Sequence, residues 1–213
     1  MAYAIVRSNK TGRAVVLDLD RQRYLGMVRK VKAFADAMSE FSKLSEIKFS
    51  YIMVTLTYVQ IDDWVANDLK DYVRNVARRK TTFGYCWVAE LQYRGAVHYH
   101  ILFAVKYGNK IEFPDRSGSW VKGMSNVRRA RSVYYVLTYV GKKYQKDYSR
   151  MPKGLRSYAV GTYDKLLRRL YRYNCLSEHE RAYVDQFGFD GLKQWVEDTV
   201  FPSEYSFFVQ FLS

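Results

Sequence analysis

The feature of this sequence that most constrains its fold is the segment 90–102, ELQYRGAVHYHIL, in which two apolar runs flank Tyr93, Arg94 and Gly95. A three-residue loop that ends in a left-handed glycine closes a hairpin of two antiparallel strands. In that register Glu90 lies directly opposite His98. A two-residue loop would pair Glu90 with Tyr99 instead, so the length of the loop decides which face of the sheet carries the carboxylate.

The two histidines of this hairpin, His98 and His100, are two residues apart and therefore point to the same face of the strand, roughly 6 to 7 Å apart. Glu90 joins them from the neighbouring strand at about 5 Å between Cβ atoms. Two imidazoles and a carboxylate predict a site for a divalent cation, Mg or Mn, with Zn also compatible. The alternative is that both histidines are solvated or packed in the core. A site of histidines alone is excluded, because only His179 remains elsewhere.

The patterns in the rest of the chain predict an α+β fold, in which helices pack on a sheet and a helical extension follows. An N-terminal hairpin covers residues 4–20, and a strand covers 48–59. Amphipathic helices are expected at about 21–44 and 62–80, the second capped by Asp62 or Asp63. Residues 83–92 and 96–105 form the histidine hairpin, 131–146 a basic helix, and three helices follow residue 163. Ser177 and Glu180 predict a capping box for the second of them.

The net charge of +14 favours a polyanionic partner, because phosphate contacts dominate affinity for nucleic acid. Residues 121–172 carry 14 Lys and Arg against 2 Asp and Glu, whereas residues 173–213 carry a net charge of −5. The 20 Tyr, 12 Phe and 4 Trp, interleaved with Arg and Lys, suit single-stranded DNA, whose bases stack on aromatic rings. A merely soluble basic protein is the alternative. The candidate DNA contacts are Arg128, Arg129, Arg131, Lys143 and Lys146.

The basic helix carries Tyr135, Tyr139, Lys142 and Lys146 at helical steps, which places them on one ridge. The tyrosines could simply pack on the sheet while the lysines remain solvated. Beside a divalent cation, however, a phenol becomes a usable nucleophile, and Lys142 can offset the negative charge that develops on a phosphodiester. The combination predicts tyrosine attack on a DNA backbone.

Three segments, 51–58 (YIMVTLTY), 90–102 and 135–142 (YVLTYVGK), resemble the motifs of HUH endonucleases in the same order. With the W-x-x-G at 120–123, they look most like the two-tyrosine replication initiators of small single-stranded DNA phages. The resemblance covers roughly residues 50–147. It implies an antiparallel sheet of ferredoxin-like or RNA-recognition-motif-like topology, in an endonuclease domain at 1–150 with a helical extension at 151–213. It also implies an origin-specific enzyme that nicks and joins single-stranded DNA through a 5′-phosphotyrosine and initiates rolling-circle replication of a phage, virus or plasmid.

By motif match, the resemblance implies metal ligands at His98, His100 and Glu90, nucleophiles at Tyr139 and Tyr135, and the motif lysine at Lys142. Thr55 and Thr57 match the first motif, with a mainly structural role. Thr138 stands where a lysine often follows the first tyrosine, so Tyr139 with Lys142 could act as a single-tyrosine site. The sequence has no P-loop, so unwinding is expected to need a host helicase, and a polymerase would extend the free 3′-hydroxyl.

Three other classes remain to be weighed. A transposase or relaxase uses the same chemistry in another DNA context, and a non-catalytic RNA-recognition-type module would bind single strands while its histidines only pack. A zinc amidohydrolase needs more ligands and a larger barrel. Two distant cysteines, no secretory signal and no run of eighteen apolar residues predict the cytoplasm of a bacterial or archaeal host cell and no membrane partner.

Overall fold

The computed structural model describes residues 3–8, 13–141, 151–189 and 207–212. The chain divides into two compact units, one formed by residues 26–174 and the other by residues 1–25 together with 175–213. The larger unit contains every residue of the predicted hairpin and both predicted tyrosines. It is therefore the unit that positions the site.

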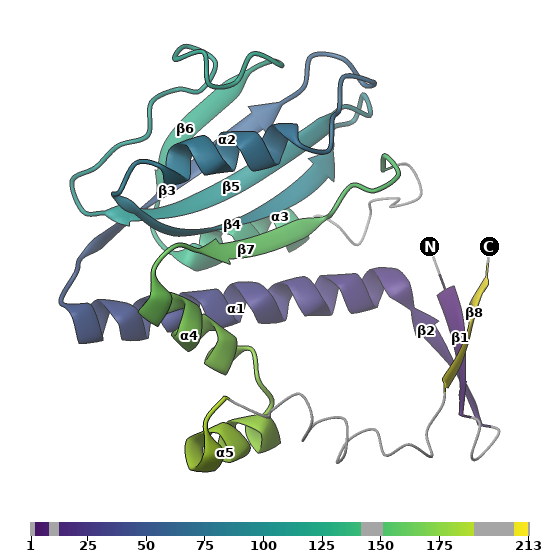
Figure 1. The fold of residues 1–213 in the computed structure, drawn as a ribbon. Helices are drawn as coiled ribbons and strands as arrows, with labels where there is room; N and C mark the ends of the chain where they lie inside the picture. Colours follow the sequence, from purple (N-terminus) through teal and green to yellow (C-terminus); the bar gives the residue numbers. More distant parts are fainter. Residues whose placement is uncertain (1–2, 9–12, 142–150, 190–206, 213) are drawn as a thin grey trace. The chain divides into compact units, whose positions relative to one another are not determined.

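The larger unit is built on a five-stranded antiparallel sheet with strand order β6-β3-β5-β4-β7 (Figure 1). Its central strand carries the two histidines and pairs with β3 on one side and β4 on the other. The expected α+β fold with an antiparallel sheet and packed helices is confirmed, and it is consistent with a ferredoxin-like topology of the HUH type. The strands are β3 (Phe49–Thr57), β4 (Thr82–Leu91), β5 (Val97–Lys106), β6 (Ser125–Ala130) and β7 (Tyr158–Thr162).

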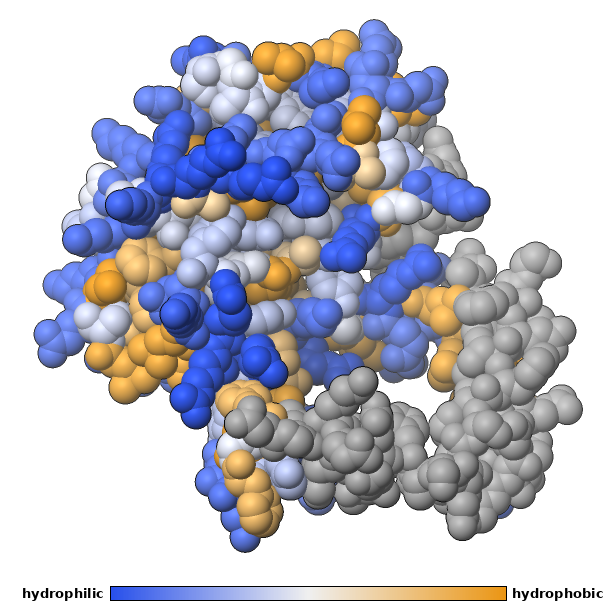
Figure 2. Space-filling view, viewed as in Figure 1, coloured by the Kyte–Doolittle hydropathy of each residue, from blue (hydrophilic) through white to orange (hydrophobic). Residues whose placement is uncertain are grey.

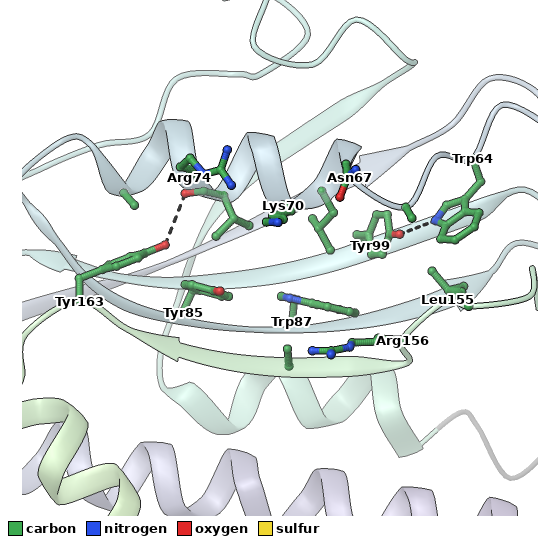
Figure 3. A pocket seen from close by; sticks show the side chains of 16 residues that line it. Trp64, Asn67, Lys70, Arg74, Tyr85, Trp87, Tyr99, Leu155, Arg156 and Tyr163 are labelled. Carbon is green, nitrogen blue, oxygen red and sulfur yellow. Dashed lines mark hydrogen bonds between the residues drawn. The ribbon is translucent and has the colours of Figure 1, made fainter.

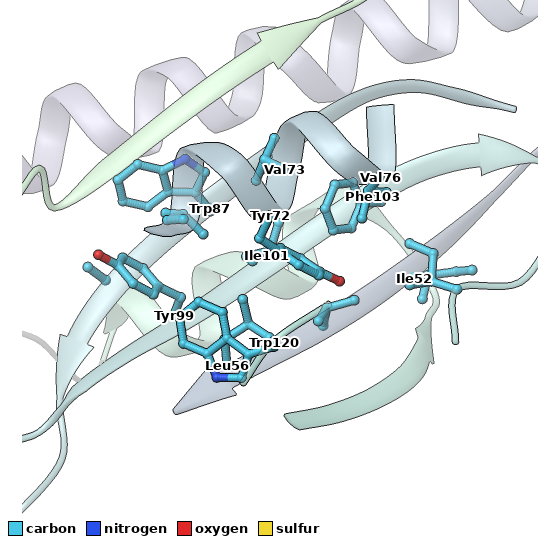
Figure 4. Close-up of a cluster of buried hydrophobic side chains, with 14 of the residues drawn as sticks. Ile52, Leu56, Tyr72, Val73, Val76, Trp87, Tyr99, Ile101, Phe103 and Trp120 are labelled. Carbon is cyan, nitrogen blue, oxygen red and sulfur yellow. The ribbon is translucent and has the colours of Figure 1, made fainter. Parts of the chain in front are cut away.

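Helices cover both faces of this sheet, because the central strands are apolar on both sides. On one face, α2 (Asp68–Ala77) buries Tyr72, Val73 and Val76 against Ile101 and Phe103 in a continuous apolar cluster (Figure 4). On the other face, α1 (Leu19–Ser45) buries one apolar stripe. The ring of Phe34 from this stripe comes so close to Gly84 of β4 that a Cβ there would lie 2.9 Å from it. The sheet is thus the middle layer of three.

Most of the elements predicted by periodicity are present with nearly the predicted bounds, but three details differ. α2 begins after Asn67, which makes no side-chain cap, so the predicted cap at Asp62 or Asp63 is wrong. The Asp63 carboxylate instead accepts a hydrogen bond from the backbone N–H of Gln60, in a turn that precedes the helix. The edge strands β6 and β7 were not predicted, since edge strands need no continuous apolar pattern. The expected helix at 131–146 is a 3₁₀ turn, η1 (Val133–Val136), followed by α3 (Leu137–Gly141), and its remainder lies outside the described residues.

The segment expected to be wholly helical, 151–213, also contributes strands. Its first part adds β7 and α4 (Lys165–Asn174) to the larger unit, because the backbone of β7 pairs with the edge of β4. The smaller unit contains α5 (Glu178–Phe187), whose predicted capping box between Ser177 and Glu180 is present. It also has a three-stranded sheet, β2-β1-β8, of Ala14–Asp18, Tyr3–Ser8 and Phe207–Leu212. None of the helices in the described ranges is both long and apolar enough to cross a membrane.

The W-x-x-G segment fastens the end of β3 that leads to the site. The Trp120 indole N–H donates to the carbonyl of Thr57 at 3.3 Å, and the Thr57 N–H donates to Met124 at 2.9 Å. Between them, Gly123 passes so close to Thr57 that a Cβ there would overlap its carbonyl oxygen. The motif glycine is therefore required by the close approach of two backbones.

Replacing Gly123 by alanine should therefore destabilise the protein by at least about 2 kcal/mol, because backbone rather than a flexible side chain must move. The matched control is Gly118→Ala. Gly118 also has a left-handed backbone, with φ of +71°, but it has open space around it, so its substitution should cost only about 1 kcal/mol. Urea unfolding of the full chain measures both, and equal losses in the two variants would contradict the steric explanation.

Candidate active site

The site is built around the histidines of β5, whose neighbours are set by strand register. Glu90 of β4 is the direct partner of His98, as the sequence predicted. On the other side, Thr57 of β3 is the partner of His98 and Thr55 is the partner of His100. Side chains that are partners in an antiparallel pair share a face. The register therefore gathers two imidazoles, one carboxylate and two hydroxyls on the face that α1 covers.

The predicted three-residue loop is what produces this register. The N–H of Gln92 donates to the carbonyl of Ala96 at 2.9 Å, and Gly95 has a φ of +92°, the left-handed conformation expected of the loop glycine. The Arg94 guanidinium extends from the loop and donates to the carbonyls of Tyr58 and Val59, just beyond β3. The hairpin is thereby fixed to both neighbours of β5.

The carboxylate of Glu90 contacts the diagonal histidine. Its Oε2 lies 3.5 Å from Nε2 of His100, and the two side chains are only 12% and 8% exposed. The rings of His98 and His100 lie 4.6 Å apart, centroid to centroid. The three predicted ligands are therefore mutual neighbours in a largely buried position.

Each imidazole contacts a threonine hydroxyl through the same ring nitrogen. Nδ1 of His100 lies 3.2 Å from Oγ1 of Thr55, and Nδ1 of His98 lies 3.2 Å from Oγ1 of Thr57. Sequence reasoning gave these threonines only a general structural role. The alternation T-x-T opposite H-x-H was the signal that could have identified the contact, given the register of β3 and β5.

The tyrosines come from a different part of the chain and meet the histidines. The Tyr139 ring stacks on the His100 imidazole, with centroids 3.7 Å apart and planes 21° from parallel. Its hydroxyl lies 3.4 Å from that of Tyr135, and the two rings pack edge to face at 5.7 Å. The junction of η1 and α3 thus still brings the two hydroxyls together. Both tyrosines lie on the same side of the sheet as the histidines.

The candidate DNA-contacting residues are dispersed. The guanidinium of Arg128 on β6 lies 5.2 Å from the ring centre of Tyr135 and 5.7 Å from that of Tyr139. Arg129, the next residue of the strand, points to the opposite face because strand side chains alternate. Arg131 follows the strand and is exposed. The candidates Lys142, Lys143 and Lys146 lie outside the described residues.

The donor atoms suit a divalent cation by their chemistry, since two imidazole nitrogens and a carboxylate oxygen form a mixed N and O set. No three His, Cys, Asp or Glu side chains within the described ranges are already arranged as a metal-binding cluster. The reason is local, because the Glu90 carboxylate is directed to the His100 ring. An ion would have to take the place of that contact.

Comparison with known proteins is consistent with this geometry. Residues 51–148, which contain β3, β4, β5, β6 and both tyrosines, match the family model of the replication-associated protein ORF2. No curated protein and no solved structure matches the chain significantly. The match covers slightly less than half of the 213 residues, and it supports a role for this chain as a replication initiator.

Proposed function

We propose that this protein is a metal-dependent endonuclease and strand transferase that cuts and rejoins single-stranded DNA at a replication origin through a covalent 5′-phosphotyrosine. The proposal rests on one observation above all. The Tyr139 ring lies against His100, and its hydroxyl lies 3.4 Å from that of Tyr135. Residues far apart in the chain thus form one constellation in which a phenol, two imidazoles and a carboxylate are neighbours.

The chemical step is a transesterification. The oxygen of Tyr139 forms a bond to the phosphorus of the scissile phosphodiester, while the bond from phosphorus to the 3′-oxygen breaks. The 3′-oxygen leaves as a hydroxyl, so the proton lost by the phenol is balanced by the one gained there. The bond energy is kept in the tyrosyl ester, which a free 3′-hydroxyl can later attack to rejoin the strand.

The second tyrosine supplies a second nucleophile or holds the first. In its present position, the Tyr135 oxygen accepts a hydrogen bond from the Tyr139 hydroxyl. Arg128 lies beside both rings and offers a positive charge to a phosphate or to a phenolate. It provides a cation where Thr138 replaces the lysine that often follows the first tyrosine.

A divalent cation, Mg or Mn, held by His98, His100 and Glu90 would polarise the scissile phosphate as a Lewis acid. An imidazole nitrogen can accept a cation only when it carries no proton. If each Nδ1 donates its proton to the threonine oxygen beside it, each Nε2 keeps its lone pair. Thr55 and Thr57 thus act as positioning residues that select the required tautomer.

A transposase or relaxase would show the same covalent step, whereas a binding module of the RNA-recognition type would show none. Formation of the tyrosyl ester therefore separates the enzyme from the binding module. The sequence of the DNA that is cut then separates an origin from a transposon end.

A 3′-labelled library of single-stranded oligonucleotides, incubated with the full chain and Mn, should give a labelled protein band that survives denaturation. Tyr139→Phe should reduce this adduct by about 100-fold or more, because it removes the attacking oxygen. Tyr135→Phe should reduce it partly if both tyrosines act in turn. Sequencing the attached DNA identifies the site that is cut.

The matched control is Tyr134→Phe. Tyr134 is adjacent in sequence, but partial burial and the nearby Asp36 carboxylate raise its pKa, and its hydroxyl lies 3.4 Å from Asp36. Its loss should leave the adduct unchanged. An adduct that persists in both Tyr139→Phe and Tyr135→Phe would refute the assignment of the nucleophiles.

Removal of either proposed histidine ligand should weaken Mn binding by on the order of 100-fold, as measured by isothermal titration calorimetry without DNA. His98→Ala and His100→Ala test this directly. His179→Ala is the matched control, since His179 is exposed on α5 and should bind no Mn. Equal affinity in all three variants and the unmodified protein would contradict a metal site at this hairpin.

Thr55→Val should shift the tautomer of His100, which ¹⁵N imidazole chemical shifts report at a pH of about 8, where an ordinary imidazole is neutral. Mn affinity should fall roughly 10-fold with it. Thr55→Ser keeps the hydroxyl and should retain both properties. A Val variant with unchanged shifts and affinity would show that the threonine serves only packing.

A further inference from the structure

The face of the sheet opposite the histidines contains a pocket of about 600 Å³ that the proposed reaction does not use. It lies between α2 and β7, over β4 and β5 (Figure 3). α2 has only ten residues, so it covers part of this face and leaves the side toward β7 open. The pocket is within the size range of sites that bind small ligands or nucleotides.

Five aromatic rings line the pocket: Trp64, Tyr85, Trp87, Tyr99 and Tyr163. They include two pairs, one of Tyr85 with Tyr163 at 5.7 Å and one of Trp87 with Tyr99 at 5.6 Å between centroids. Tyr99 lies between His98 and His100 in β5. Because strand side chains alternate, its ring is on the opposite face from theirs. The pocket is thus separate from the candidate active site.

Hydrogen bonds hold the rings at both ends of the pocket. The Trp64 indole donates to the Tyr99 hydroxyl at 2.7 Å, and the Tyr163 hydroxyl donates to the carbonyl of Val73 at 3.4 Å (Figure 3). Burial raises the pKa of Tyr85, and it raises that of Tyr99 to about 12, so both phenols are neutral. A ligand would therefore meet a preformed and uncharged aromatic surface, which lowers the entropic cost of binding.

The charged residues that line the pocket, among those that the structure describes, are all cationic. Lys70 and Arg74 project from α2, and Arg156 comes from the segment before β7; all three are exposed. Arg74 pairs with Asp71 at 3.2 Å, but both side chains are more than half exposed, so this pair holds the guanidinium weakly. Figure 2, drawn from the same side as Figure 1, shows strongly hydrophilic side chains at the level of α2 above less polar atoms.

Core packing accounts for part of this lining only. Trp87 and Tyr99 belong to the apolar cluster under α2 and are nearly buried. Tyr163 is 37% exposed, and the three cations face solvent, so packing gives no reason for their presence around aromatic rings. Neutral rings flanked by cations match one chemistry well, that of unpaired bases with their phosphates.

We propose that this pocket is a second binding site for single-stranded DNA, in which bases stack on the aromatic rings while Lys70, Arg74 and Arg156 contact the phosphates. The choice of DNA as the ligand rests on the proposed function. The bound stretch is distinct from the scissile one, because it lies on the other face of the sheet. The site would hold a flanking part of the strand while the tyrosines act.

Photo-crosslinking tests the proposal directly. The full chain, kept in chelator to prevent cutting, is irradiated with an oligothymidylate of about 12 nucleotides that carries 5-iododeoxyuridine, a length suited to one single-strand site. Crosslinked peptides are then mapped by mass spectrometry. Crosslinks to Tyr85, Trp87 or Tyr163 are expected. Crosslinks confined to the face of His98 and Tyr139, or none at all, would overturn the proposal; the latter would leave an acidic protein segment as the better occupant.

A matched pair of charge variants gives the second measurement. The triple variant Lys70→Ala, Arg74→Ala and Arg156→Ala should abolish the pocket crosslinks and reduce the salt dependence of binding by about 2 in log–log slope, from about 0.7 per lost phosphate contact. The control replaces Arg78, Lys80 and Lys153, which are exposed and do not line the pocket, so it loses the same charge. Equal effects in both triple variants would mean that only net charge matters.

The covalent adduct separates this proposal from the proposed function. With saturating DNA and Mn, the pocket variant should still form the adduct, because its substitutions lie on the opposite face from the tyrosines. Adduct without pocket crosslinks would reject the second site and leave the nicking reaction intact. Pocket crosslinks without any adduct would reject the reaction and leave a single-strand binding site.

Discussion

The constraint on which this structure depends is the register of one strand. β5 is paired with β4 through a three-residue loop and with β3 through a long antiparallel ladder. A shift of one residue on either side would turn a carboxylate or a hydroxyl to the other face, since side chains alternate along a strand. The left-handed Gly95 fixes one register, and Arg94 fastens its loop to the backbone beyond β3. The candidate site is thus secured by backbone geometry before any ligand is considered.

The same alternation gives the strand two different faces. His98 and His100 point toward the tyrosines, and Tyr99 between them points into the aromatic pocket under α2. A sheet that is covered by helices on both sides can hold chemistry on one face and a binding surface on the other. In the proposed enzyme this would let one rigid element position the scissile phosphate and a flanking stretch of DNA. Any movement of β5 would be felt at both sites.

Buried polar groups at the site are stabilised by one another. The Glu90 carboxylate contacts His100, each imidazole contacts a threonine, and the Tyr139 ring covers one imidazole face. Groups of this kind are costly to bury unless they are hydrogen-bonded or paired. The proposed cation would exchange some of these contacts for its own. The arrangement therefore suits a site that must persist both with and without an ion.

The sequence alone determined the features that depend on local spacing. The hairpin loop, the pairing of Glu90 with His98, the long first helix and the capping box at Ser177 followed from patterns of a few residues, and the structure has all of them. Local spacing also placed Tyr135 and Tyr139 on one side, although the helix proved to begin as a 3₁₀ turn.

Only the tertiary structure decided what depends on partners far away in the chain. The pairing of β6 and β7 with a sheet edge, the stacking of Tyr139 on His100 and the position of Arg128 beside both tyrosines come from segments that have no local signal for each other. The aromatic pocket likewise needs α2, β4, β5 and β7 together. Periodicity reports which face of an element is buried, but packing determines which other element it meets.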